Sequence, residues 1–357
     1  MSFKEQYLTK NTNIYFISEI GINHNGIFDL AIQMIEKSKE AGASAVKFQK
    51  RDADCLLLSG TKLETPTGYL SKDAEDLPDE SKAFGTWTYP DTRLEFTDDQ
   101  HLELWDHATR LGLNYIVSPW DENSLEFLVE NKAKVIKIPS IDTNNFWFME
   151  LVASKKIPVI ASVGMCNWSE INKTWQIFKE SECPLMFLQC TSAYPSEIID
   201  KNLKCIPILQ NLFNQDVGFS GHGIGYTGTY GAVALGAEVI EKHVTLSRDM
   251  SGPDQNASLE FNEVKILVDE ANKIKEALGT TNKVFLDSEK VLHGVLTKKI
   301  IASKPIKSGD ELTFDNLRTV VTKKEGGILP NKYFEILNRK ASRDLETNHI
   351  LNTEDFV

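Results

Sequence analysis

The sequence predicts a (β/α)8 barrel followed by a small β-rich domain, and three observations lead to this fold class. Short apolar, β-branched runs recur eight times in the first three-quarters of the chain. Segments with helical spacing separate them, which is typical of a parallel sheet covered by helices. Eight such units in about 230 residues match the size of this barrel. An open doubly wound sheet is the second possibility, which is disfavoured because no GxGxxG turn follows the first run.

The eight predicted strands are near-continuous apolar runs that end in polar residues. They cover residues 13–21, 44–50, 114–120, 135–140, 157–164, 185–191, 217–222 and 238–244. Residues 29–43 and 97–112 are predicted helices, and the second has Thr97 as its N-cap and Gly112 as its end. Residues 51–96 form a long insertion, which in a barrel would emerge at the catalytic face as a lid.

The pattern of strands and helices stops after about residue 280, which predicts a domain boundary. Residues 296–320, LTKKIIASKPIKSGDELTFDNLRTV, mix short β-like runs with turn residues. We therefore expect a barrel domain over residues 1–280, a linker over 281–293 and a small separate domain over 294–357.

Composition and charge exclude several classes of protein. The net charge of -12 argues against non-specific nucleic-acid binding and against docking on an anionic membrane. No apolar run approaches the roughly 20 residues that span a bilayer, and the polar start MSFKEQYLTKNTN lacks a secretory h-region. The five cysteines are scattered with no CxxC pair, which is typical of reduced thiols in a cytoplasm. We expect a cytoplasmic protein.

Polar residues stand at the ends of the predicted strands, where barrel enzymes carry their active sites. In chain order these candidates are Glu19, Asn23, His24, Lys47, Gln49, Ser118, Lys137, Ser140, Asp142, Ser162, Ser192, Tyr194, Ser220, His222 and His243. Lys47 and Lys137 each lie inside an apolar strand, where an ammonium group is costly to bury without an anion. A single strand lysine is more often an edge residue or part of a core ion pair. The pair together indicates an anionic ligand, a phosphate or a carboxylate.

Two histidines end the last two predicted strands. His222 and His243 would lie roughly 5 Å apart in the strand-pairing direction if their strands are neighbours. Neutral imidazoles so placed can bind one divalent metal and leave other positions open for water or substrate. A lone strand-end histidine is more often structural. His101 and His107, on the helix over 97–112, and His349, near the end of the chain, are interpreted as solvated surface residues.

Eight segments resemble the sialic acid synthase family, whose members condense phosphoenolpyruvate with an N-acetylated hexosamine. They are SEIGINHNG (18–26), AVKFQK (45–50), KIPSIDTNN (137–145), SVGM (162–165), QCTSAYP (189–195), GFSGH (218–222), LGAEVIEKHVT (235–245) and GPDQNASLE (252–260). The segment IKSGDELTFDNL (306–317) resembles the antifreeze-like (SAF) domain that follows the barrel in this family. The resemblance therefore covers nearly the full chain.

The resemblance implies a role for each matching residue. His222 and His243 would bind a divalent ion, Mn2+ or Mg2+, that activates the aldehyde of the open-chain sugar, and Glu19 and Asp142 would handle protons. The acceptor sugar would face Gln49, Tyr194 and Asp254. Phosphoenolpyruvate would be held by Lys47, Ser118, Lys137, Ser140, Ser162, Ser192 and Ser220. Its carbon 3 would attack the aldehyde, water would add at carbon 2, and phosphate would leave.

The sequence also departs from many bacterial members of the family. Gly221 stands where they carry Asp, and Val163 where they carry Thr. In many members the SAF domain supplies an Arg to the barrel of the other subunit, which implies a domain-swapped homodimer. Here the comparable loop reads TKKEGGI (322–328), so Lys323 is the nearest cation. A lysine offers charge but not the planar two-pronged contact of an arginine.

Several alternatives remain open at the level of the sequence. The acceptor is N-acetylmannosamine, its 6-phosphate, or a 2,4-diacetamido-trideoxy hexose, as in legionaminic and pseudaminic acid synthases. A phosphorylated acceptor would need a further cation, for which Arg51, Lys62, Lys72 and Lys82 are candidates. A related 3-deoxy-ulosonate synthase or metal-dependent aldolase would keep the barrel and change the chemistry. A non-enzymatic hypothesis is that the C-terminal module is an ice- or carbohydrate-binding surface. It leaves the paired lysines and the paired histidines unexplained.

Overall fold

The computed structural model describes residues 2–56, 63–64, 88–89 and 92–357. These residues separate into two compact units, Met1–Gly279 and Thr280–Val357. Most of the predicted lid over residues 51–96, with Lys62, Lys72 and Lys82, lies outside the described residues. No helix among the described residues is long and apolar enough to cross a membrane. Their five cysteines are all free thiols.

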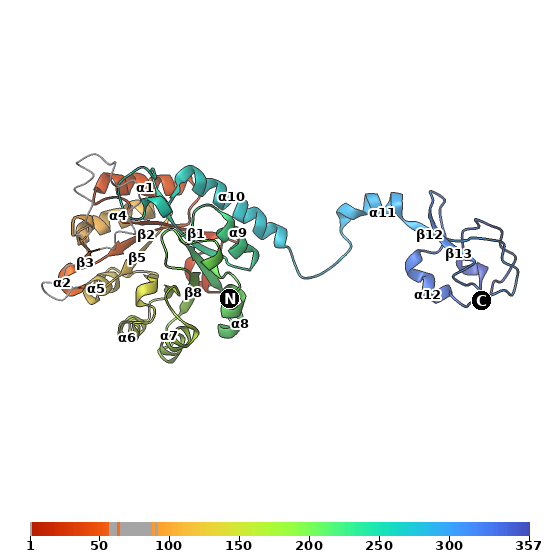
Figure 1. Ribbon diagram of the computed structural model, residues 1–357, viewed down its shortest axis with the longest axis horizontal. Coiled ribbons are helices and arrows are strands. Elements are labelled where there is room, and N and C mark those ends of the chain that lie inside the picture. The colour runs from red at the N-terminus through yellow and green to blue at the C-terminus, as the bar shows by residue number, and fades with distance from the viewer. Residues whose placement is uncertain (1, 57–62, 65–87, 90–91) are drawn as a thin grey trace. The chain divides into compact units, whose positions relative to one another are not determined.

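The first unit is built on eight parallel strands, and all eight were predicted. They are β1 (Tyr15–Gly21), β2 (Ala45–Lys50), β5 (Asn114–Pro119), β6 (Ile136–Ile138), β7 (Val159–Ser162), β8 (Leu185–Cys190), β9 (Val217–Gly221) and β10 (Val239–Thr245). Their order in the sheet is β5-β2-β1-β10-β9-β8-β7-β6, and β5 also lies beside β6. The sheet therefore curls into a nearly closed (β/α)8 barrel, which confirms the predicted fold class (Figure 1).

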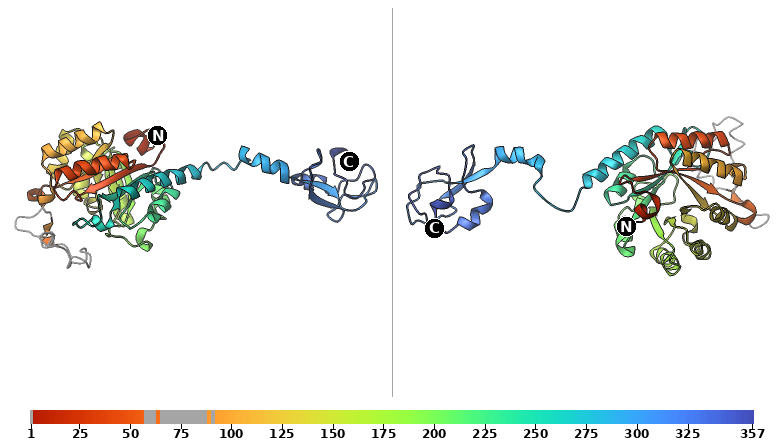
Figure 2. Two further views of the ribbon diagram at one scale, coloured as in Figure 1. Left: turned by 90° about the horizontal axis from the view of Figure 1, so that it is seen from above. Right: turned by 180° about the vertical axis from the view of Figure 1, so that it is seen from behind.

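Helices surround the strands on the outside, as the additional views in Figure 2 make plain. They are α1 (Phe28–Glu40), α4 (Asp98–Arg110), α5 (Glu122–Glu130), α6 (Phe146–Ser154), α7 (Trp168–Glu180), α8 (Cys205–Phe213), α9 (Thr227–Ala234) and α10 (Phe261–Leu278). Helix α4 begins as predicted, because the Thr97 hydroxyl accepts from the Gln100 amide in a capping box. The minor elements of this unit are α2 (Ala53–Leu56), β3 (Leu63–Glu64), β4 (Thr88–Tyr89) and β11 (Leu259–Glu260).

Strand alternation divides the side chains of the barrel into an outer and an inner set. The outward residues, such as Phe16, Phe48 and Ile240, pack beneath the helices in the main core. The inward residues of the lower barrel form a second cluster that includes Tyr15, Ile17, Ala45, Ile116, Ile160, Met186, Leu188 and Val239. Polar residues stand above this apolar layer, at the carboxyl ends of the strands. The barrel is therefore a filled core with a polar upper layer.

The N-terminal segment closes the lower end of the barrel, which the polar composition of residues 1–13 did not predict. Phe3 packs into the inner apolar cluster just before a helical turn, η1 (Lys4–Leu8). The Lys4 ammonium is buried and donates to the Asn13 carbonyl at 2.7 Å and to Glu238 Oε2 at 2.9 Å. This segment is therefore part of the fold.

His101 corrects one sequence interpretation. It was expected on a solvated face, but it is 1% exposed and its Nδ1 lies 2.8 Å from the Tyr115 hydroxyl. Burial lowers the pKa of His101 to about 3. His107 and His349 are half-buried beside Glu36 and Asp355 respectively. The helical pattern alone did not show how closely α4 approaches β5.

The second unit has its own small apolar core. Strands β12 (Lys298–Ala302) and β13 (Leu317–Val321) pair antiparallel, and the short helices are α11 (Lys290–Leu296) and α12 (Tyr333–Ile336). The buried core residues are Ile300, Ala302, Ile306, Leu312, Leu317, Ile328, Ile336, Ala341, Leu345 and Leu351. A separate core allows this unit to be considered as a domain of its own.

Candidate active site

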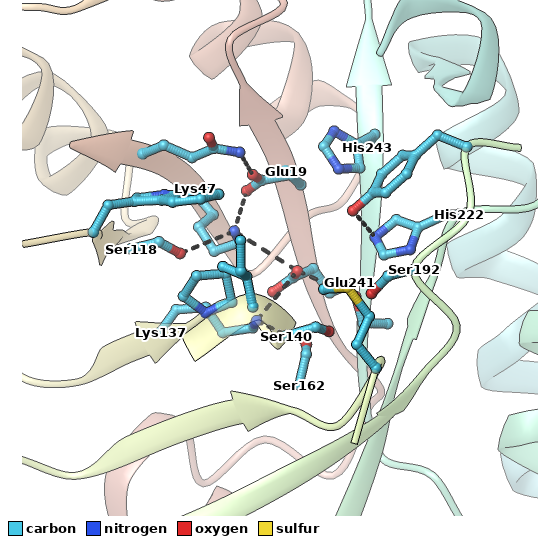
Figure 3. A pocket seen from close by; sticks show the side chains of 17 residues that line it. Glu19, Lys47, Ser118, Lys137, Ser140, Ser162, Ser192, His222, Glu241 and His243 are labelled. Atoms are coloured by element: carbon cyan, nitrogen blue, oxygen red, sulfur yellow. Dashed lines mark hydrogen bonds and ion pairs between the residues drawn. The ribbon is translucent and has the colours of Figure 1, made fainter. Parts of the chain in front are cut away.

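A cavity of about 210 Å³ opens at the carboxyl ends of the barrel strands. Twelve of the predicted site residues line it, whereas Asn23, His24, Asp142 and Asp254 do not. The full lining is Glu19, Lys47, Gln49, Ser118, Trp120, Lys137, Pro139, Ser140, Ile141, Ser162, Met165, Ser192, Tyr194, Ser220, His222, Glu241 and His243. Figure 3 shows these side chains converging from neighbouring strands on one space. The structure thus brings together residues that are up to 224 positions apart along the chain, since Glu19 and His243 both line it.

Strand register explains why the charged residues meet. Glu19 on β1 pairs with Lys47 on β2 and with His243 on β10, so the three stand side by side and point inward. Glu241 precedes His243 by two residues on β10 and therefore shares its face. Its neighbour on β9 is Ser220, whose hydroxyl donates to Glu241 Oε1 at 3.3 Å.

Two lysines and two glutamates form a buried charge cluster at the cavity floor. Lys47 Nζ lies 2.7 Å from Glu19 Oε2 and 3.7 Å from Glu241 Oε1. Lys137 Nζ lies 3.7 Å from the same Glu241 oxygen. No side chain in the cluster is more than 6% exposed. Protein carboxylates already balance the two lysines, so burial of the lysines alone no longer requires an anionic ligand.

The pKa shifts in this cluster follow from burial and from the opposite charges. Burial opposes the charge of Glu241, but Lys137 and Lys47 together lower its pKa. Burial lowers the pKa of Lys137, whereas the two glutamates raise the pKa of Lys47 despite its burial. Burial also raises the pKa of Glu19, against the effect of Lys47. Because that ion contact measures 2.7 Å, we assign the ionised Glu19–Lys47 pair at neutral pH.

Serine hydroxyls lie beside the two ammonium groups and make the cavity floor suitable for an anion. Ser118 Oγ accepts from Lys47 Nζ at 3.3 Å, and Ser162 Oγ accepts from Lys137 Nζ at 2.8 Å. Ser140 and Ser192 both approach Gly164, where any Cβ would collide with both hydroxyls. Hydroxyl and ammonium donors around one space are the groups that bind phosphate and carboxylate oxygens.

His222 and His243 lie next to each other at one side of the cavity, with ring centroids 5.5 Å apart. His222 Nδ1 is 2.9 Å from the Thr191 carbonyl, which can only accept, so this nitrogen carries the proton. His222 Nε2 then faces the Tyr194 hydroxyl at 3.1 Å. Burial lowers the pKa of His243 well below its usual value. Burial has the same effect on His222, but Cys190, Thr191 and Glu241 outweigh it and raise its pKa.

The donor set of the two histidines fits a divalent metal with open coordination positions. The buried Nδ1 of His243 has no hydrogen-bond partner among the described side chains and lies 3.9 Å from Asp254 Oδ2. Within the described part of the chain, no group of three or more His, Cys, Asp or Glu residues gathers as a closed metal cage. Two imidazoles with further positions left to water or substrate are typical of a catalytic metal rather than a structural one.

Asp142 and Asp254 lie outside the cavity lining. Asp142 Oδ1 accepts from Asn145 Nδ2 at 3.2 Å, and burial raises the pKa of Asp142 to about 6. Asp254 stands behind His243, and burial also raises its pKa. Gln49 donates to Glu19 Oε1 at 3.1 Å and so orients that carboxylate within the cavity. The roles predicted for these residues remain predictions.

Sequence reasoning missed five residues of the lining: Glu241, Trp120, Pro139, Ile141 and Met165. Glu241 could have been predicted, since it precedes His243 by two residues in the strand EVIEKHV and therefore lies on the same face. The other four lie at or beyond strand ends, where apolar residues have no periodicity that separates a cavity wall from an ordinary loop.

Known proteins are similar to this chain in sequence, and solved structures are similar to it in fold. The NeuB family model matches residues 34–283. A pseudaminic acid synthase of Campylobacter jejuni is 36% identical over 344 residues, 96% of each protein. An N-acetylneuraminate-9-phosphate synthase of Mus musculus is 36% identical over 95% of this chain and 92% of that protein. The crystal structure of an N-acetylneuraminic acid synthetase from Leptospira borgpetersenii is 30% identical, with a TM-score of 0.66 over 79% of this chain and 90% of that one.

Proposed function

Since this chain belongs to the NeuB family of sialic and nonulosonic acid synthases, we propose that it is a transferase that condenses phosphoenolpyruvate with an N-acetylated hexosamine. The product is a sialic or other nonulosonic acid, and inorganic phosphate is released. One observation carries the proposal: a floor of lysine and serine donors adjoins a histidine pair at the open end of the barrel. The first binds an anionic substrate and the second a carbonyl-activating metal.

Phosphoenolpyruvate binds at the floor of the cavity in this proposal. Its phosphate and carboxylate receive hydrogen bonds from the two lysines and the surrounding hydroxyls of Ser118, Ser140, Ser162, Ser192 and Ser220. The substrate competes with Glu19 and Glu241 for the ammonium groups. Fixed donors in a buried site stabilise the departing phosphate without reorganising at the moment of reaction.

The bond changes balance as follows. Carbon 3 of phosphoenolpyruvate forms a bond to the aldehyde carbon of the open-chain sugar, whose oxygen takes up a proton. Water adds to carbon 2, and Glu19 accepts its proton because it is the buried carboxylate that lines the cavity beside His243. The bond from carbon 2 to the phosphate oxygen breaks and leaves a ketone. The second proton of the water leaves with the inorganic phosphate, and Glu19 passes the first to the former aldehyde oxygen. Asp142 lies outside the lining, so its part in proton handling is kept as a separate prediction.

We propose that His222 and His243 hold a divalent ion, Mn2+ or Mg2+. When bound there, such an ion supplies Lewis-acid activation of the sugar carbonyl. Thr191 fixes the His222 ring through the protonated Nδ1, which leaves the lone pair of Nε2, beside the Tyr194 hydroxyl, to bind the ion. Tyr194 lines the cavity beside the two rings and orients the acceptor, whereas Asp254 lies outside the lining, so its contact with the acceptor is a separate prediction.

The experiment measures phosphate released from phosphoenolpyruvate with each candidate acceptor, with and without Mn2+, after treatment with a chelator. We expect metal-stimulated release that is lost in His222→Ala and His243→Ala. His107→Ala, on the outer helix α4, is the matched control and keeps the activity. Full activity of the chelator-treated His222→Ala protein would refute the metal assignment. An aldolase or a 3-deoxy-ulosonate synthase would release no phosphate with these acceptors.

We further propose that the protein acts as a cytoplasmic homodimer whose second unit is an SAF domain that reaches the other copy's barrel. The free cysteines are consistent with a reducing compartment. Exposed apolar residues that follow β6, β8 and β9 support a docking face at the mouth of the barrel, namely Trp147 at the start of α6, Ile199 in a helical turn and Ile224. In such a dimer, Lys323 supplies the cation that other family members supply as an arginine.

A further inference from the structure

Two buried lysines stand outside the cavity lining and have no part in the proposed reaction. Lys242 lies between Glu241 and His243 on β10, both of which line the cavity. Strand alternation therefore directs Lys242 away from the barrel interior. Lys201 ends a helical turn, η6 (Ile199–Lys201), in the segment after β8. Lys242 is 2% exposed and Lys201 is 6% exposed.

Both ammonium groups reach the backbone next to His222. Lys242 Nζ donates to the Gly223 carbonyl at 2.7 Å. Lys201 Nζ packs against Gly223, where a Cβ would lie 2.0 Å from it, and donates to Ser196 Oγ at 3.0 Å. The Ser196 amide in turn donates to the His222 carbonyl at 3.1 Å. Two successive carbonyls are therefore held, that of Gly223 by one lysine directly and that of His222 by the other through a serine.

This arrangement is costly for the fold. An ammonium group lowers stability when it is buried without a carboxylate. Neither lysine forms an ion pair with a carboxylate of the described residues, and their acceptors are backbone carbonyls and one hydroxyl. Burial, and after it the charge of Lys201, lower the pKa of Lys242 to about 8. A methionine would fill the same space as Lys242 without this cost. What the lysine adds is the hydrogen bond to Gly223.

The segment that receives this hydrogen bond needs external contacts to hold one conformation. His222 stands between Gly221 and Gly223, and Gly225 follows with a φ of +73°. Glycine leaves the backbone more conformations than any other residue. The His222 ring is fixed at Nδ1 by the Thr191 carbonyl at 2.9 Å. That contact orients the ring only while the backbone that carries it stays in place.

Resting on the proposed function, we propose that Lys242 is a positioning residue that, with Lys201, fixes the backbone of His222 and so presents Nε2 of its ring to the divalent ion. A ligand that is already in place needs no ordering when the ion binds, which raises the affinity. Partners behind a metal ligand act in this way when they orient it. The fold thus gives up stability at Lys242, and the site gains affinity for the ion.

Calorimetric titration of the chelator-treated protein with MnCl2 tests this role without turnover. We expect Lys242→Met to weaken Mn2+ binding by at least about tenfold, the effect of removing a partner that orients a metal ligand. Its melting temperature should equal or exceed that of the parent, because the buried ammonium group is gone. At saturating Mn2+ its kcat should return to near the parent value, because both imidazoles are still present.

Lys4→Met is the matched control. Lys4 is also buried, but it lies at the lower end of the barrel, where its Nζ is 2.9 Å from Glu238 Oε2. This variant should lower the melting temperature, because it removes a buried ammonium group that has a carboxylate partner, and should keep the parent's affinity for Mn2+.

A parent protein that binds no Mn2+ refutes the metal assignment and this inference with it. Binding that Lys242→Met leaves unchanged overturns only the role of Lys242. Weaker binding together with a melting temperature as low as that of Lys4→Met would make Lys242 a structural residue. A kcat that stays low at saturating Mn2+ would likewise contradict a role in affinity for the ion.

Discussion

At the scale of the residue, Glu241 is the carboxylate that the two buried lysines share. Its Oε1 lies 3.7 Å from Lys47 Nζ and 3.7 Å from Lys137 Nζ. We expect Glu241→Gln to lower the free energy of unfolding by about 3 kcal/mol, since it leaves two ammonium groups with one carboxylate. The glutamine keeps the size of the side chain and the contact with Ser220. Urea denaturation measures the change.

A double-mutant cycle separates this charge effect from a loss of packing. Adding Lys137→Met to Glu241→Gln removes the surplus ammonium group, so the double variant should be more stable than the sum of the single changes by at least about 1 kcal/mol. Additive losses would show that the 3.7 Å contact contributes nothing to stability.

Asp142 should make stability depend on pH. Burial raises its pKa to about 6, so the folded protein holds this proton more tightly than the unfolded chain does. The resulting stabilisation is complete below about pH 4 and is lost as the pH rises through about 6. Because each pKa unit is worth about 1.4 kcal/mol, Asp142→Asn should stabilise the protein at pH 7 by about 2 kcal/mol, allowing for partial exposure, and have little effect near pH 4.

Thermal or urea unfolding at pH 4, 6 and 7.5 measures this dependence. Ser154→Ala, an exposed change on the neighbouring helix α6 that removes no titratable group, is the control and should alter stability equally at each pH. A constant difference between Asp142→Asn and the parent across this range would contradict the assignment. If the stable variant also loses turnover, Asp142 takes part in proton handling as the family resemblance implies.

The polar residues of the site could be predicted because strand alternation is a strict rule. Lys47 and Lys137 could be predicted because they interrupt apolar strands, and His222 and His243 because they end strands. All four line one cavity. Glu241 was not predicted, although alternation places it on the same face of the strand as His243, two residues later. Ile141 and Met165 could not be found, because an apolar loop residue at a cavity mouth and one in an ordinary loop look identical in sequence.

At the scale of the element, all eight barrel strands could be predicted because parallel strands buried on both faces read as continuous apolar runs. The N-terminal segment could not. Its composition is polar, and its place is set by two long-range contacts, Phe3 in the barrel interior and Lys4 on Glu238. Contacts over more than 200 positions leave no periodic trace in the sequence.

Because this segment closes the lower end of the barrel, away from the cavity, we expect a change in it to affect stability and not catalysis. Phe3→Ala should lower the free energy of unfolding by about 3 kcal/mol, because it removes a buried aromatic side chain from the inner cluster. The KM for phosphoenolpyruvate should stay the same, since the segment packs at the end of the barrel opposite the cavity. Gln6→Ala, an exposed change in the same turn, is the control. A raised KM in stable Phe3→Ala protein would show that the lower cluster positions the floor of the site.

At the scale of the whole molecule, each of the two units exposes large apolar side chains. Trp147 at the start of α6, Ile199 in a helical turn and Ile224 are 62%, 83% and 75% exposed, and each follows a barrel strand at the end that carries the cavity. Phe314 and Phe334 of the second unit are 80% and 84% exposed. Soluble monomers seldom leave such surfaces uncovered, and two copies of one chain can cover both by symmetric exchange.

This arrangement predicts a dimer that depends on the barrel face. Light scattering should give the parent protein about twice its chain mass of 40.2 kDa at micromolar concentration. Ile199→Lys combined with Ile224→Lys should shift it toward the single-chain mass, because dimerisation would bury two unpaired ammonium groups. Turnover per chain should then fall on dilution if the second copy contributes Lys323 to the site. Ile266→Lys changes an isoleucine that is 51% exposed on α10, away from this face, and should leave the mass unchanged. A parent protein that is monomeric throughout this range would refute the dimer and with it any role of Lys323 across subunits.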